Sequence, residues 1–189
     1  MQRVWKSITG FYHVCARGMG GQLIFESDED RWEFLGLMRD CCRDVQVTIA
    51  AWCLMGDYVD LVLLDYEDKM SAAMQRLLLT YARRFNKRTG RAGCLFRERF
   101  ERRSLDTDWQ VMEAIRSVHA DPQEAGMSLI ECYPWSSFAS ICAPTTAMRP
   151  MPREDFLILL ACLSFSVLPR ALLHIRFRLP TAVSQRCVI

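Results

Sequence analysis

Positively charged side chains crowd into one stretch of this chain. The stretch from position 76 to position 103 holds ten of them, and all but one are arginines. The whole chain has a formal net charge of only +2, so this positive charge is concentrated locally. The planar guanidinium group of arginine binds two phosphate oxygens at once. We therefore predict a nucleic-acid-binding surface made of Arg17, Arg76, Arg83, Arg84, Lys87, Arg88, Arg91, Arg97, Arg99, Arg102 and Arg103.

The same charges have a second interpretation. A run of basic residues on a helix is often only a solvated face, here opposite a core side that includes Met74, Leu77 and Tyr81 at helical spacing. Phe96 and Phe100 stand between the arginines, where they either stack on unpaired bases or belong to the core. Phosphate contacts would position a nucleic acid without selecting its sequence.

A second group of polar residues could take part in catalysis. Tyr58 and Asp60 lie two apart in a predicted strand, so they share one face of the sheet. The carboxylate of Asp60 can bind a divalent cation through one oxygen, whereas a neutral phenol is a poor ligand for a hard cation. One carboxylate alone makes a weak metal site. Ser117 and His119 lie near the end of a predicted helix, where a lone histidine is most often structural.

Composition places the chain among folded proteins. Of its 189 residues, 51% are hydrophobic and 24% are charged, which excludes a disordered chain. Nine cysteines include no C-x-x-C pair, and this usage is typical of reduced thiols in a cytosolic protein. The first residues lack the apolar run of a secretory signal, and the apolar run 156–168 is too short to span a bilayer. We expect a cytoplasmic protein that does not enter the membrane.

The hydrophobic pattern predicts alternating strands and helices. Segments rich in β-branched and aromatic residues indicate strands at 11–16, 45–54, 58–64 and 100–105, with Leu95-Phe96 joined to the last. Apolar residues at helical spacing indicate helices at 28–43, 69–89 and 108–120. Antiparallel pairing of the middle strands, with helices packed on one face, gives an α+β fold with a ferredoxin-like sheet.

The chain divides into a domain and a tail. Residues 1–140 contain all the predicted strands and helices, and we assign them to one DNA-binding domain. The chain becomes irregular after Asp121-Pro122, and residues 141–189 read as a linker followed by an apolar C-terminal tail.

Several segments, taken in order, resemble the REP-associated tyrosine transposases, which belong to the single-tyrosine, histidine-hydrophobic-histidine transposases. The resemblance runs from about Gly10 to Phe138. It rests on Gly10 to Gly18, Ile24-Phe25 with Asp30-Arg31, Trp52 to Met55, Ala73 to Arg76 with Tyr81 to Arg88, Gly93 to Phe100, Asp121-Pro122 before Ala125-Gly126, and Tyr133 to Ser137.

The resemblance implies a ferredoxin-like fold that binds single-stranded DNA carrying a short hairpin. Active family members hold a divalent cation, Mg²⁺ or Mn²⁺, with two histidines and attack the phosphate with a tyrosine. Here Tyr58 and Asp60 occupy the positions of the two histidines, and Ser117 occupies that of the tyrosine. His119 matches a position of the family motif and is a candidate base or DNA contact.

We interpret the chain as a DNA-binding protein that has lost strand cleavage, and which therefore needs no cofactor. Two alternatives stay open. The first is an active strand transferase with relocated catalytic residues, for example Asp60 with Asp57 holding the metal. The second is a protein-interaction module whose basic face meets an acidic partner. The family includes both monomers and homodimers, and the sequence favours neither.

Overall fold

The computed structural model describes residues 6–97 and 99–142, the last three of them by their backbone alone. The apolar run 156–168 and the tail predicted beyond residue 142 lie outside the described residues. The elements follow in the order β1 (Phe11–Arg17), η1 (Met19–Gly21), α1 (Asp28–Asp44), β2 (Thr48–Leu54), β3 (Tyr58–Leu64), α2 (Met70–Thr89), β4 (Glu101–Leu105), α3 (Asp108–Glu124), η2 (Ile130–Cys132) and α4 (Ser137–Cys142).

The four strands form one antiparallel sheet in the order β2-β3-β1-β4. Strands β1 and β2 are joined through α1 with β3 inserted between them, and β3 and β4 are joined through α2 with β1 inserted between them. This is the double split β-α-β arrangement of ferredoxin-like folds. The predicted α+β class and strand order along the chain are confirmed.

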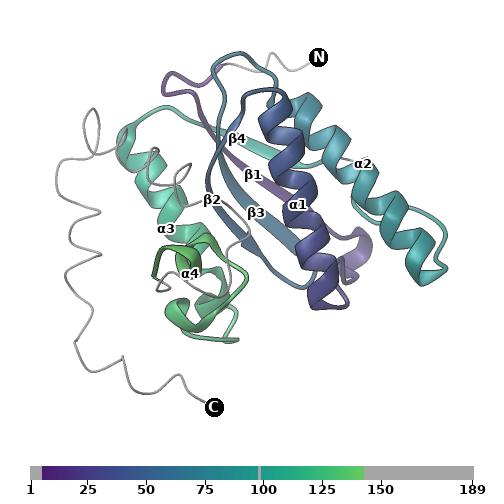
Figure 1. The fold of residues 1–189 in the computed structure, drawn as a ribbon. Coiled ribbons are helices and arrows are strands. Elements are labelled where there is room, and N and C mark those ends of the chain that lie inside the picture. Colours follow the sequence, from purple (N-terminus) through teal and green to yellow (C-terminus); the bar gives the residue numbers. More distant parts are fainter. Residues whose placement is uncertain (1–5, 98, 143–189) are drawn as a thin grey trace. The chain divides into compact units, whose positions relative to one another are not determined.

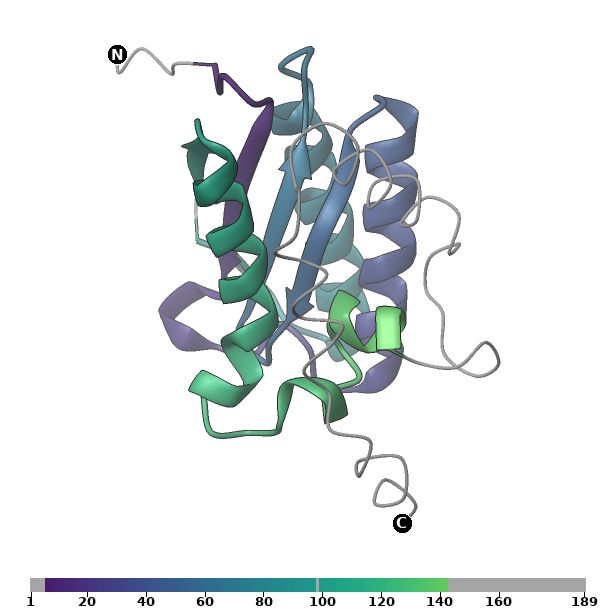
Figure 2. The same cartoon turned by 90° about the vertical axis from the view of Figure 1, so that its left-hand side faces the viewer.

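Helices cover both faces of the sheet (Figure 1). Helices α1 and α2 pack against each other on one face, and α3 lies on the opposite face against β2, β3 and β4 (Figure 2). The prediction that helices pack on one face therefore holds for α1 and α2 only. Because side chains alternate along a strand, Tyr12 and Val14 point toward α1 and α2, whereas His13, Cys15 and Arg17 point toward α3.

Local sequence explains where the helices begin. Ser27 and Asp30 form a capping box at the start of α1, and Thr107 and Gln110 form the same motif at the start of α3. Helix α2 ends at Gly90, whose φ of 66° is a left-handed conformation that glycine adopts without strain.

Helix α3 runs further than the sequence suggests. The predicted end at residue 120 is wrong, because the helix continues to Glu124 with Pro122 inside it. A proline removes one backbone hydrogen bond and normally ends a helix. Here Pro122 falls in the last turn, where its ring is buried, and its carbonyl accepts the N–H of Met127 at 2.9 Å. Because of this extra turn, Asp121 lies within the helix and not in a loop.

The outer edge of β2 is covered by the segment from Tyr133 to Ser137. The Tyr133 hydroxyl donates to the Leu54 carbonyl at 2.7 Å, and the Leu54 N–H donates to the Trp135 carbonyl at 2.8 Å. The Ser137 hydroxyl accepts the N–H of Trp52 at 3.0 Å. These bonds pair backbone groups of β2 that would otherwise be unpaired at the edge of the sheet.

The segment after β1 approaches its neighbours very closely at Gly18. A Cβ atom there would lie 2.2 Å from the carbonyl oxygen of Gln22. The Gly18 N–H donates to the Asp57 carbonyl at 2.7 Å, and Gly18 forms an isolated bridge with Phe96. Leu95-Phe96, predicted as the start of the fourth strand, therefore pairs beside the end of β1, and β4 itself begins at Glu101.

None of the helices in the described part of the chain is both long enough and apolar enough to cross a membrane.

Candidate nucleic-acid interface and substituted catalytic face

The α3 side of the sheet brings together Tyr58 and Asp60, the residues at the two positions that the resemblance assigns to metal ligands. In the register of β1 and β3, Arg17 pairs with Tyr58 and Cys15 pairs with Asp60. His13 lies two residues from Cys15 and so points to the same side. Tyr58 and Asp60 thus share one face, as their spacing predicted, and two more functional groups, His13 and Arg17, join them from β1.

His13 and Asp60 form a pair across the two central strands. The Nε2 atom of His13 lies 2.8 Å from Oδ1 of Asp60. The Asp60 side chain is only 10% exposed and that of His13 is 23% exposed. The two atoms lie within ion-pair distance, but both are buried and neither has a hydrogen-bond partner of suitable geometry. Sequence reasoning did not single out His13, because its only signal was its place in a strand whose register was unknown.

Tyr58 is held between a cation and a carboxylate. The guanidinium carbon of Arg17 lies over the Tyr58 ring, 4.5 Å from its centroid. Burial, and next the negative charge of Asp121, raise the pKa of the Tyr58 hydroxyl well above its ordinary range. Tyr58 is therefore a neutral phenol at physiological pH.

Asp121 faces the same cluster from α3. Burial, followed by the negative charge of Asp60, raises the pKa of Asp121 from 3.8 to about 7. A hydrogen bond from Tyr58 acts in the opposite direction and stabilises the charged form. Near neutral pH this carboxyl group is therefore a mixture of the protonated and ionised forms. The cluster comprises His13, Cys15, Arg17, Tyr58, Asp60 and Asp121, and we call it the substituted face.

Ser117 and His119 do not share one environment. Ser117 is exposed and precedes Asp121 by one helical turn. His119 is buried, and its Nε2 lies 2.7 Å from the Ser137 hydroxyl that also accepts the Trp52 N–H. Burial lowers the pKa of His119 from 6.5 to about 4, so the ring is neutral near pH 7. These contacts give His119 a structural role that joins α3 to the covered edge of β2.

The substituted face is not an assembled metal site. Asp60, the residue expected to bind metal alone or with Asp57, lies 2.8 Å from His13, and neither of the two contacting atoms has a hydrogen-bond partner. Tyr58 is a neutral phenol, and burial raises the pKa of the Cys15 thiol to about 12, so neither is an anionic ligand. Within residues 6–97 and 99–142, no group of three or more His, Cys, Asp or Glu side chains could hold a metal ion.

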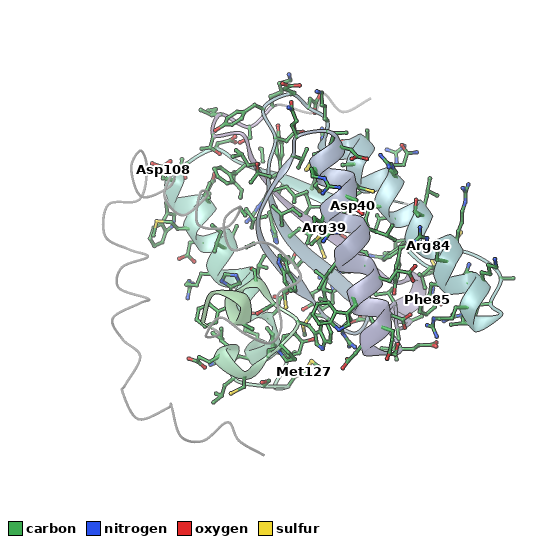
Figure 3. All side chains as sticks on the ribbon, viewed as in Figure 1. Arg39, Asp40, Arg84, Phe85, Asp108 and Met127 are labelled. Carbon is green, nitrogen blue, oxygen red and sulfur yellow. The ribbon has the colours of Figure 1, made fainter. Side chains whose placement is uncertain are left out.

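Much of the charge on α2 is neutralised by α1. Arg76 binds Asp44 at 2.9 Å, and Arg84, labelled in Figure 3, binds Glu33 at 3.0 Å. Arg88 lies 2.7 Å from the carboxylate of Asp30, which is only 2% exposed. These three predicted DNA contacts therefore also hold the two helices together.

Arg102 likewise has an internal partner. It lies on the α2 side of the sheet, 20% exposed, and donates to the hydroxyl of Ser71 at 2.9 Å. Phe96 is 8% exposed and its ring lies near that of Tyr81 in the core, whereas Phe100 is half-buried. The core interpretation therefore applies to Phe96.

The remaining predicted contacts are exposed. Arg97 has a marginal contact of 4.0 Å with Glu101, and Arg91 contacts the amide of Gln22. Within the described part of the chain, five basic residues from the predicted surface have no carboxylate within 4.0 Å and no hydrogen-bonded side-chain partner; they are Arg17, Arg83, Lys87, Arg99 and Arg103.

Comparison with known proteins finds likeness at the level of structure. No protein-family model and no curated protein sequence matches the chain. A REP-associated tyrosine transposase, solved bound to a REP hairpin, is similar with a TM-score of 0.60 and 13% identity, over 80% of this chain and 93% of that chain. A putative transposase from Deinococcus radiodurans R1 matches with a TM-score of 0.41 and 19% identity, over 62% of this chain and 94% of that one. At 13% identity, the first likeness shows that the chain shares the fold of that transposase.

Proposed function

We propose that the chain is a transposase-like DNA-binding protein that holds single-stranded or hairpin-bearing DNA without cleaving it. The observation that carries this proposal is the fold shared with a transposase solved on a DNA hairpin, over 93% of that protein. Single-stranded DNA bearing a hairpin is the partner that the sequence resemblance also implies.

Exposed cations supply the binding energy. Arg83 and Lys87 lie four residues apart on α2, so they share one helical face. Arg17 lies on β1, Arg99 lies in the segment before β4, and Arg103 lies on β4. Each cation that contacts a phosphate releases counterions from the DNA, and the affinity of such a complex falls steeply with salt. Because Arg76, Arg84 and Arg88 are bound to carboxylates, we assign them a smaller share.

The chemistry of the substituted face supports the proposed loss of cleavage. Strand cleavage by the family's route needs a cation that polarises the phosphate and a nucleophile that attacks it. Asp60 lies within ion-pair distance of His13, and the raised pKa of Tyr58 disfavours the phenolate that would attack. His119, the nearest histidine in sequence to Ser117, is buried and bonded to Ser137, so it does not activate that hydroxyl.

Fluorescence anisotropy with labelled DNA tests the binding proposal. We expect a hairpin with single-stranded flanks to bind more tightly than a blunt duplex of the same length, with affinity falling as salt rises. The double substitution Arg83→Ala with Lys87→Ala should reduce the slope of log K against log salt by about 1.4, if both residues contact single-stranded phosphates. Binding that is absent, or independent of salt, would contradict the proposal.

A further inference from the structure

The guanidinium group of Arg17 lies over the ring of Tyr58, with 4.5 Å between the guanidinium carbon and the ring centroid. Arg17 is exposed and Tyr58 is half-buried, so the guanidinium group covers the ring from the solvent side. No carboxylate of the described residues lies within ion-pair distance of Arg17. The guanidinium group thus lies against an aromatic ring while Arg17 stays exposed to solvent.

A flat guanidinium group supported by an aromatic ring is suited to a nucleobase. Unpaired bases in protein complexes stack on aromatic side chains and on guanidinium planes. Lysine, which carries the same charge on a flexible stem, lacks the flat surface that such stacking needs. The preformed contact with Tyr58 also reduces the entropy that Arg17 would lose on binding.

The charges around the stack favour a base over a phosphate. Asp121 lies beside Tyr58 from α3, and Asp60 lies two residues along β3. Glu101 pairs with Cys15 in the register of β1 and β4, which places a third acidic residue on this side of the sheet. These carboxylates repel a phosphate placed directly over Tyr58, whereas a neutral base avoids that cost.

Basic residues that would contact phosphates lie near Arg17. Arg103 pairs with His13 in the register of β1 and β4, so it lies on the same face of the sheet as Arg17. The N–H of Arg97 donates to the carbonyl of Arg17 at 3.0 Å, which brings the basic segment 97–103 next to the end of β1. A strand whose backbone contacts this segment can place one base over Arg17.

We infer that Arg17 and Tyr58 form a stacking site for one unpaired nucleotide of the bound strand, on the face where the family places its metal. This inference rests on the proposed DNA binding and specifies the ligand of the substituted face. The site recognises the flat surface of a base, so it prefers single-stranded flanks to duplex and accepts any of the four bases.

The test uses the whole protein and hairpin DNA whose single-stranded flank carries 2-aminopurine, a fluorescent base that is quenched by stacking. We expect one flank position to be strongly quenched when the wild-type protein binds. Replacing that nucleotide by an abasic residue should weaken binding about tenfold. Arg17→Lys should reproduce this loss with intact DNA and should show no further loss with abasic DNA.

Two other variants separate stacking from charge and from folding. Tyr58→Phe keeps the ring and should retain the quenching, whereas Tyr58→Leu should lose it. Arg103→Lys, the matched control, should leave the tenfold preference for the intact flank unchanged. If wild-type protein binds the hairpin but no position is quenched and no abasic residue weakens binding, the stacking site is wrong while DNA binding stands. If wild-type protein binds no DNA, both proposals fail.

Discussion

The Nε2 atom of His13 lies 2.8 Å from the Asp60 carboxylate, so an imidazole of β1 and a carboxylate of β3 meet within ion-pair distance. The pair joins the two central strands of the sheet on the side covered by α3.

The first prediction concerns this pair. His13→Gln and Asp60→Asn should each destabilise the protein, by about 2 kcal/mol for the variant that leaves a buried charge unpaired. In a double-mutant cycle followed by urea unfolding, we expect a coupling energy of about 1 kcal/mol or more. Additive effects would show that the two side chains do not interact.

The second prediction concerns Asp121 and pH. Its pKa is raised from 3.8 to about 7 in the folded protein, so the folded state holds its proton more tightly than the unfolded chain. Stability should therefore fall as pH rises from about 4 to about 7. Asp121→Asn should remove this loss, and it should stabilise the protein at pH 8 by about 1 kcal/mol after allowance for partial solvent exposure. Urea unfolding of both proteins at pH 5 and pH 8 measures the difference.

The third prediction concerns His119, through which stability should change with pH in the opposite direction. His119 has its pKa lowered from 6.5 to about 4 by burial, so the unfolded chain binds the proton more readily. Stability should fall as pH decreases from about 6.5 to about 4, by a total of about 2 to 3 kcal/mol. His119→Gln, measured in the Asp121→Asn background, should flatten the curve in that window. A curve that keeps its slope would assign the proton uptake to another group.

The fourth prediction separates structural arginines from DNA contacts. Arg88→Ala removes the partner of the buried Asp30 and should cost about 2 kcal/mol of stability. The matched variant Arg83→Ala removes an exposed cation from the same helix and should change stability by less than about 0.5 kcal/mol. Among variants that fold, we expect Arg83→Ala to lose more DNA affinity at low salt than Arg88→Ala. Equal losses of stability would contradict the difference in pairing.

The fifth prediction concerns Gly18. A methyl group there would lie 2.2 Å from the backbone carbonyl of Gln22, which cannot move aside as a flexible side chain would. Gly18→Ala should therefore destabilise the protein by about 2 kcal/mol. Gly20→Ala, where the added Cβ meets nothing within 4 Å but φ is 63°, is a control for backbone strain alone.

The order of strands and helices could be predicted because local pattern determines it. Strand β3 coincides with a run of mostly apolar and β-branched residues, and α1 begins at the capping box of Ser27. The end of α3 could not be read in the same way. A proline in a last turn costs only one hydrogen bond, and the packing of Pro122 compensates for it.

The candidate site was predicted less completely, because its contacts join distant parts of the chain. Arg76, Arg84 and Arg88 were recognised as a basic group, but their acidic partners lie 32, 51 and 58 residues away on another helix. His13 reaches Asp60 only through the register of two strands. Spacing in the sequence predicts which residues share a face, but tertiary contacts decide which charges remain free.

The most direct measurement is a denaturing gel of the protein with 5′-labelled hairpin DNA that carries single-stranded flanks, in Mg²⁺ or Mn²⁺, at concentrations where anisotropy shows binding. We expect all the bound DNA to be recovered at full length and free of protein. A shortened strand, or a covalent adduct that survives denaturation, would contradict it.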